Sequence, residues 1–139
     1  LSVLHECAQR GIPATVHVAI GTDIVHQQPG ASGEDIGRAS LEDFRRMCEV
    51  VASLEGGVVV NVGSAVILPE VFLKALTVAR NLGHRVRRFT AANLDMIQHY
   101  RPRLNVVERP TALGGRRIVL TGHHELLVPM LAQAVLERL

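Results

Sequence analysis

Apolar and polar positions along this chain follow two periods, and residues 54–83, LEGGVVVNVGSAVILPEVFLKALTVARNLG, contain both. The β-branched run VVVNV at residues 58–62 predicts a strand buried on both faces, as in parallel sheets. A helix is predicted to begin near Pro69, because apolar residues then recur at helical spacing. Gly83 is expected to close that helix as the residue after its C-cap.

The amino-terminal third is predicted to hold two helices and a strand. A short apolar face over residues 3–8 ends at a Gly-Ile-Pro turn, and the alternating ATVHVAI at residues 14–20 predicts a strand. Residues 21–37 show no period and are interpreted as a long loop. Ser40 and Asp43 resemble a capping box, which predicts a helix that runs on to the central strand.

The remainder continues the alternation of strands and helices. Residues 85–91 predict a strand, residues 99–115 a loop with a short strand near residues 104–107, residues 116–121 a strand and residues 125–139 a closing helix. This order predicts an α/β domain over residues 1–139, a three-layer Rossmann-like parallel sheet with helices on both faces.

Small residues follow the central strand. Gly63, Ser64 and Ala65 would let the chain turn sharply and let a ligand approach the backbone amides. Because parallel sheets gather ligands beyond the carboxyl ends of their strands, a phosphate or nucleotide is expected there. The alternative is purely structural, since any buried strand–helix unit needs small residues at its turn.

Polar residues are predicted at the same edge of the sheet. Asp23 and His26 leave the carboxyl end of one predicted strand, and Thr90 and Asp95 follow another. A carboxylate at a strand end binds ribose hydroxyls in dinucleotide sites, although an aspartate in an Asx-turn or a helix cap has the same sequence context.

The reactive-looking cluster TGHHE ends the last predicted strand. His123 and His124 are adjacent, so their side chains tend to diverge, and no metal site is expected. A nucleophilic triad with Ser64 lacks a G-x-S-x-G elbow. Together with His26, these histidines are candidates for acid–base catalysis, because the ordinary pKa of an imidazole lies near neutral pH.

Composition restricts the class of protein. Hydrophobic residues make up 47% and aromatics 3% of the 139 residues, which suits layered α/β packing. The formal charge of +2 does not indicate nucleic-acid binding, and no apolar stretch is long enough to span a membrane. Cys7 and Cys48 stand far apart, as expected of reduced, buried thiols in a cytoplasmic protein. Because the chain begins with Leu1, within a predicted helix, we expect that an amino-terminal part of a longer protein is missing.

The order of these segments resembles the second half of deoxyhypusine synthase, an NAD-dependent enzyme that transfers an aminobutyl group from spermidine to a protein lysine. The similarity lies in the Gly-Ile-Pro turn before residues 14–20, in GTD at residues 21–23, in EGGVVVNVGSAVI, in TAANLD at residues 90–95 and in the closing LLVPML. It covers most of the chain at low identity.

The resemblance implies an NAD-binding fold and a homo-oligomer whose sites are shared between subunits. The residues that it places in the NAD pocket are Thr22, Asp23, Gly63, Thr90, Ala91 and Asp95, with His123 nearby. Ser64 and Ala65 join them through the turn. The family's catalytic lysine has no counterpart, because the matching region reads ALGGRRIV and the only lysine, Lys74, lies within a predicted helix.

We therefore expect a nucleotide-binding protein without deoxyhypusine synthase activity. Two alternatives belong to other classes: a catalytically silent, oligomeric scaffold domain, and a phosphosugar-binding isomerase-like domain in which Ser64 and its neighbouring amides hold phosphate.

Overall fold

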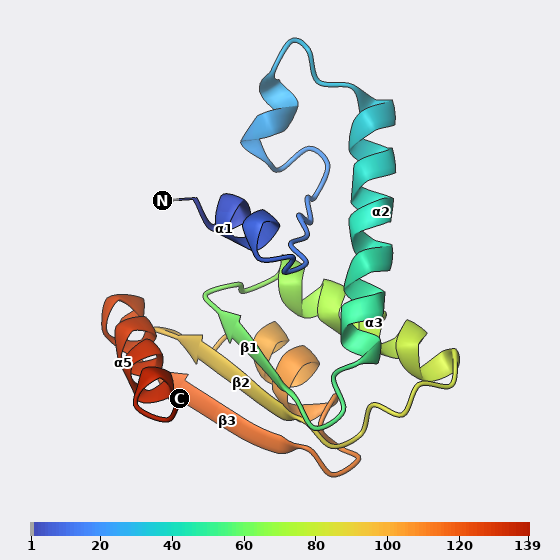
Figure 1. The fold of residues 1–139 in the computed structure, drawn as a ribbon. Coiled ribbons are helices and arrows are strands. Elements are labelled where there is room, and N and C mark those ends of the chain that lie inside the picture. Colours follow the sequence, from blue (N-terminus) through green and yellow to red (C-terminus); the bar gives the residue numbers. More distant parts are fainter. Residues whose placement is uncertain (1) are drawn as a thin grey trace.

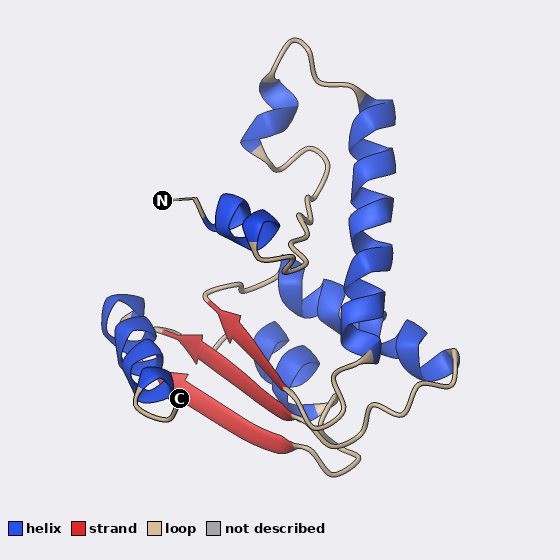
Figure 2. Ribbon diagram, in the orientation of Figure 1, coloured by secondary structure: helices blue, strands red, loops and turns tan. Residues whose placement is uncertain are grey.

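The computed structural model describes residues 2–139 and contains a three-stranded parallel sheet with five α-helices (Figures 1 and 2). The elements in chain order are α1 (Val3–Gln9), the 3₁₀ turn η1 (Ile24–Gln27), α2 (Gly33–Ala52), β1 (Val58–Val62), α3 (Ile67–Asn81), β2 (Thr90–Asp95), α4 (Tyr100–Pro102), the π-helical turn η2 (Arg103–Glu108), β3 (Arg116–Thr121) and α5 (His124–Leu136). The class is α/β and Rossmann-like in kind, which confirms the coarse fold prediction.

The strands lie side by side in the order β1-β2-β3, all parallel. Val62 of β1 is level with Leu94 of β2, and Leu94 is level with Leu120 of β3. The three carboxyl ends therefore meet at one edge of the sheet. This chain order across the sheet is that of a mononucleotide-binding half of a dinucleotide-binding fold.

The core lies between the sheet and the helices α3 and η2. Phe72 of α3 meets Phe89 edge to face, with ring centroids 6.3 Å apart. The apolar face predicted for α3 is confirmed, and α2 packs against its outer side. Gly83 follows α3 with φ +92°, as predicted for the residue after a C-cap. The buried residues of this cluster are Val51, Phe72, Ala75, Leu76, Ala79, Val86, Phe89, Ala91, Val106 and Val107.

The expectation that β1 is buried on both faces is wrong, because β2 occupies the middle of the sheet. Five of the six β2 residues are buried, whereas Val58, Val60 and Val62 of β1 are between 39% and 63% exposed. By register these valines share their face with Ile118 and Leu120 of β3, which are also exposed. Among residues 2–139, this face of β1 and β3 is left largely uncovered.

Three predicted strands are corrected. Residues 14–20 form no strand, since they have no neighbouring strand to pair with among the described residues. The strand expected at residues 85–91 begins only at Thr90, and residues 104–107 are helical. The low β-propensity of TAANLD concealed a strand that burial stabilises.

The start of α2 also differs from the prediction. The helix begins at Gly33, and the Oγ of its N-cap Ser32 accepts the N–H of Asp35 at 3.2 Å. Ser40 lies within the helix, so no capping box forms there. Instead, Asp43 accepts the N–H of Val16 at 2.8 Å and ties residues 14–20 to α2. No helix within residues 2–139 is long and apolar enough to cross a membrane.

Candidate functional site

The carboxyl ends of the strands are joined by backbone hydrogen bonds that continue past the strands themselves. The N–H of Gly63 donates to the carbonyl oxygen of Leu94 at 3.1 Å, and the N–H of Gly122 donates to that of Asp95 at 3.1 Å. Gly63 and Asp95, which are distant in the sequence, are therefore neighbours at one edge. This is the edge at which Rossmann-like sheets bind ligands.

The turn after β1 requires a glycine at its first position. Gly63 has φ +69°, a left-handed conformation that is costly for other residues. The Oγ of Ser64 accepts the N–H of Leu68 at 3.2 Å and so caps the first turn of α3. Within residues 2–139, no acceptor pairs with the backbone N–H groups of Ser64, Ala65 or Val66. These donors, beside the positive end of α3, suit an anionic group.

His124 lies directly over this turn. Its Nε2 is 3.1 Å from the carbonyl oxygen of Leu94, and a Cβ placed on Gly63 would be 3.0 Å from the Cε1 of its ring. Because a carbonyl only accepts, Nε2 carries the proton and the lone pair of a neutral ring is on Nδ1. His123 is exposed and is the N-cap of α5, without a side-chain capping bond. His124 is therefore the histidine that the fold brings to Gly63.

Asp95 ends β2 at the same edge. Asp95 is 8% exposed, and its Oδ1 accepts a hydrogen bond from the N–H of Ile97 at 3.5 Å. This long bond leaves most of the carboxylate's hydrogen-bonding capacity free, so Asp95 can accept hydroxyl donors from a ligand.

A chain of side-chain amides crosses the sheet beneath these groups. The Nδ2 of Asn61 donates to the Oδ1 of Asn93 at 2.7 Å and to the carbonyl oxygen of Ser64 at 3.0 Å. Asn93 donates in turn to the Oε1 of Gln98 at 2.7 Å, and the Nε2 of Gln98 reaches the Oγ1 of Thr121 at 3.2 Å. The chain of amides thus links the turns after β1 and β2 to the last residue of β3. Sequence reasoning missed it, although an asparagine that interrupts each of two apolar strands was a signal.

The predicted residues of the first loop lie elsewhere. Figure 1 shows η1 beside the amino-terminal end of α2, well away from the strand ends. Thr22 and Asp23 both form hydrogen bonds with the backbone of Ala19. The Oγ1 of Thr22 donates to its carbonyl oxygen at 2.9 Å, and the carboxylate of Asp23 accepts from its N–H at 2.8 Å. The Nδ1 of His26 accepts the N–H of Gly21 at 3.3 Å, while its buried Nε2 has no partner within residues 2–139. These contacts order the loop locally and do not bring it to Gly63.

Thr90 and Ala91 also fall outside the edge where they were predicted. Thr90 begins β2 and therefore lies at its amino end, opposite Asp95. Ala91 is fully buried in the core. The expected positions were wrong because the strand was placed several residues too early along the chain.

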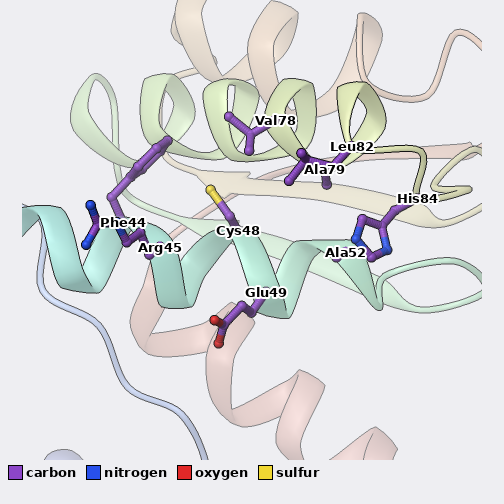
Figure 3. Close-up of a pocket in the computed structure, with 9 residues that line it drawn as sticks. All are labelled: Phe44, Arg45, Cys48, Glu49, Ala52, Val78, Ala79, Leu82 and His84. Carbon is purple, nitrogen blue, oxygen red and sulfur yellow. The ribbon is translucent and has the colours of Figure 1, made fainter.

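A groove of about 310 Å³ separates α2 from α3 (Figure 3). The Cys48 thiol points across it toward Val78 of α3, whereas Glu49 turns away. Burial, and to a smaller extent the Glu49 carboxylate, raises the pKa of the Cys48 thiol. Because a thiol with a raised pKa is a weak nucleophile at neutral pH, Cys48 serves as a core residue.

Within residues 2–139, no three His, Cys, Asp or Glu side chains converge in a way that suits a metal ion. The chain is thus an α/β domain, Rossmann-like in kind, whose strand ends carry a glycine turn, the carboxylate of Asp95 and the imidazole of His124. Comparison with protein-family models, curated proteins and solved structures gives no match.

Proposed function

We propose that this chain binds a dinucleotide, NAD or a close relative, at the carboxyl ends of β1 and β2. The observation that carries the proposal is the unit β1–Gly63–α3–β2–Asp95. A glycine turn that opens a helix accepts the pyrophosphate, and a carboxylate at the end of the next strand accepts the ribose hydroxyls. Gly63 and Asp95 occupy these two positions.

The resemblance to deoxyhypusine synthase supports the same ligand, and it is the basis for the finer proposal of that family's NAD-binding fold. Gly63 and Asp95 are two of the residues that the resemblance places in the pocket. The family's catalytic lysine has no counterpart, and Lys74 is engaged in an ion pair with Glu70 on α3. We therefore propose nucleotide binding without deoxyhypusine synthase activity.

His124 is the residue that we assign to acid–base work beside the ligand. Its ring covers Gly63, and the free Nδ1 can exchange a proton with a bound group. A pyrophosphate that reaches the amides of Ser64 and Ala65 must displace this ring or bind against it. Replacing His124 with alanine would therefore alter the affinity for NAD, and either direction of change would place the ring beside the ligand.

Thermal unfolding in the presence of a ligand panel tests the proposal. NAD, NADH, ADP-ribose and two sugar phosphates would each be added at increasing concentration. A ligand at a hundred times its Kd stabilises the folded state by about 2.7 kcal/mol. Stabilisation by NAD or ADP-ribose supports the proposal, whereas stabilisation by sugar phosphates alone would favour the isomerase-like alternative.

A second candidate function, an oligomeric scaffold, is favoured by the exposed apolar surface. The chain exposes 9581 Å², whereas a compact monomer of this mass exposes roughly 7,100 Å². The difference between these two areas is comparable to the area that each partner buries in a large obligate dimer, about 1,000–2,500 Å². Large apolar side chains on α5 are part of this exposed surface, since Leu126, Met130 and Leu136 are 62–68% exposed.

Sedimentation velocity tests this second candidate. The scaffold proposal predicts a dimer or larger species that NAD does not alter, and a Met130→Glu/Leu136→Glu variant that is monomeric. A monomeric parent chain at micromolar concentration would eliminate it.

A further inference from the structure

Arginines gather at the opposite end of the sheet, where the strands begin. Arg80 in the last turn of α3 and Arg85 and Arg87 in the connection to β2 line one cleft of about 630 Å³, together with His84 and Leu113. Figure 1 shows this connection on the far side of the sheet from α5. The cleft is therefore separate from the edge that holds Gly63 and Asp95.

The cleft carries more positive charge than the one nearby carboxylate, that of Glu55, offsets. Arg80 donates to the carbonyl oxygens of Val86 and Pro110, both at 2.8 Å, which fixes its guanidinium in the wall. Burial and then the nearby charge of Arg87 lower the pKa of Arg80, and the Glu55 carboxylate opposes this only in part, so the two cations lie close enough to repel each other. Within residues 2–139, no carboxylate lies within 4.0 Å of the guanidinium of Arg80, Arg85 or Arg87.

The nearest acid is occupied with the backbone. Glu55 accepts the N–H groups of Arg87 at 2.5 Å and Arg88 at 2.8 Å, and its Oε1 is 3.8 Å from the Nε of Arg88. It holds the connection in place and leaves the guanidinium of Arg87 unpaired. The adjacent residue Arg88 lines a second cleft of about 370 Å³ together with Arg116.

We propose that the cleft lined by Arg80, Arg85 and Arg87 binds a small ligand that carries a chain of phosphate groups. Guanidinium forks match phosphate oxygens in charge and geometry, and an anion between Arg80 and Arg87 would relieve their repulsion. The volume lies within the range of small-molecule clefts, about 300–1,000 Å³.

The same lining disfavours a nucleic-acid strand. Within residues 2–139, the lining of the two clefts contains no Tyr or Trp, and its one Phe, Phe89, is 3% exposed and belongs to the core. The exposed imidazole of His84 is the one ring left for a base, whereas nucleic-acid strands are bound by stacking successive bases on several aromatic side chains. The phosphates are therefore the part of the ligand that this cleft recognises.

Isothermal titration with inorganic tripolyphosphate tests the proposal. We expect the tightest tripolyphosphate site to lose about 10-fold or more in affinity in Arg85→Ala/Arg87→Ala, because two charge-assisted hydrogen-bonding groups are removed. The matched control is Arg10→Ala/Arg38→Ala, which removes the same charge from exposed ion pairs on α1 and α2. Its affinity should fall less than about two-fold, and circular dichroism should show both variants folded.

Three results would overturn the assignment. One is the absence of tripolyphosphate binding, and another is an equal loss in both double variants, which would indicate diffuse attraction to net charge. The third is tighter binding of a duplex oligonucleotide that the Arg85→Ala/Arg87→Ala change abolishes. An Asp95→Asn variant should bind tripolyphosphate normally, so that failure here and failure of the proposed dinucleotide site are distinguishable.

Discussion

Removing the central amide of the cross-sheet chain is expected to destabilise the fold strongly. Asn93 is fully buried; it accepts a hydrogen bond from Asn61 and donates one to Gln98, both at 2.7 Å. In an Asn93→Ala variant the Oε1 of Gln98 loses its hydrogen-bond donor, and the Nδ2 of Asn61 keeps only its hydrogen bond to the carbonyl oxygen of Ser64. The turns after β1 and β2 would lose their shared anchor.

The expected cost follows from what is left without partners. A buried polar group deprived of its partner costs about 1–3 kcal/mol, and two groups are affected, with a small cavity in addition. We expect Asn93→Ala to reduce the free energy of unfolding by about 2–4 kcal/mol. That is a large share of the roughly 5–15 kcal/mol that stabilises a typical domain.

Urea unfolding followed by circular dichroism measures this loss. Asn81→Ala is the matched control, because Asn81 is the exposed last residue of α3 and its change should stay within about 0.5 kcal/mol. An Asn93→Leu variant separates volume from polarity, since it fills the space but leaves the same groups unpaired. If either Asn93 variant were as stable as the parent chain, the structural role of the amide chain would be refuted.

Three further predictions concern single residues. Two backbone N–H donors lower the pKa of the Glu55 carboxylate. The stability that this carboxylate contributes is therefore complete above its unfolded pKa of 4.5 and is lost as pH falls through the lower folded value. A Glu55→Gln variant should lose stability less steeply below pH 4.5 in acid titrations, and an unchanged slope would contradict this. Alkylation of Cys48 by iodoacetamide at pH 7.5 should be slower than that of Cys7, as peptide mass spectrometry would reveal; equal rates would show that burial does not protect the thiol. Gly115→Ala places a Cβ 2.6 Å from the carbonyl oxygen of Phe89, so the backbone must shift and the midpoint of thermal unfolding should fall by several degrees; an unchanged midpoint would argue against this close approach.

The elements that the sequence predicts well are those whose residue types favour one secondary structure over a continuous run. The valine run of β1, the apolar face of α3 and the last strand, β3, all lie where the pattern places them. Residues 14–20 alternate equally well, but a strand also needs a neighbour, and periodicity does not reveal whether one is present. The strand β2 shows the converse, because its middle position allows alanine and asparagine to form a buried strand.

The site is predictable where chain order alone determines position. Gly63 follows β1 and Asp95 ends β2, so the parallel topology suffices to bring them together. The pairing of Asn61 with Asn93 depends on register, which no local pattern specifies here. The position of residues 21–37 depends on α2 standing away from the sheet, so Thr22, Asp23 and His26 could not be placed from sequence.

Equilibrium binding of ADP-ribose is the most direct test of the dinucleotide site. Titration calorimetry would compare the parent chain with Asp95→Asn, which preserves the side-chain shape and the oxygen that accepts from Ile97. Asp35→Asn, an exposed aspartate in the first turn of α2, is the matched control. We predict one site per chain and a loss of about 10- to 100-fold for Asp95→Asn alone, since a charged acceptor of hydroxyl donors contributes roughly 1.5–3 kcal/mol. No binding by the parent chain, or equal affinities in all three proteins, would contradict a nucleotide site at the strand ends.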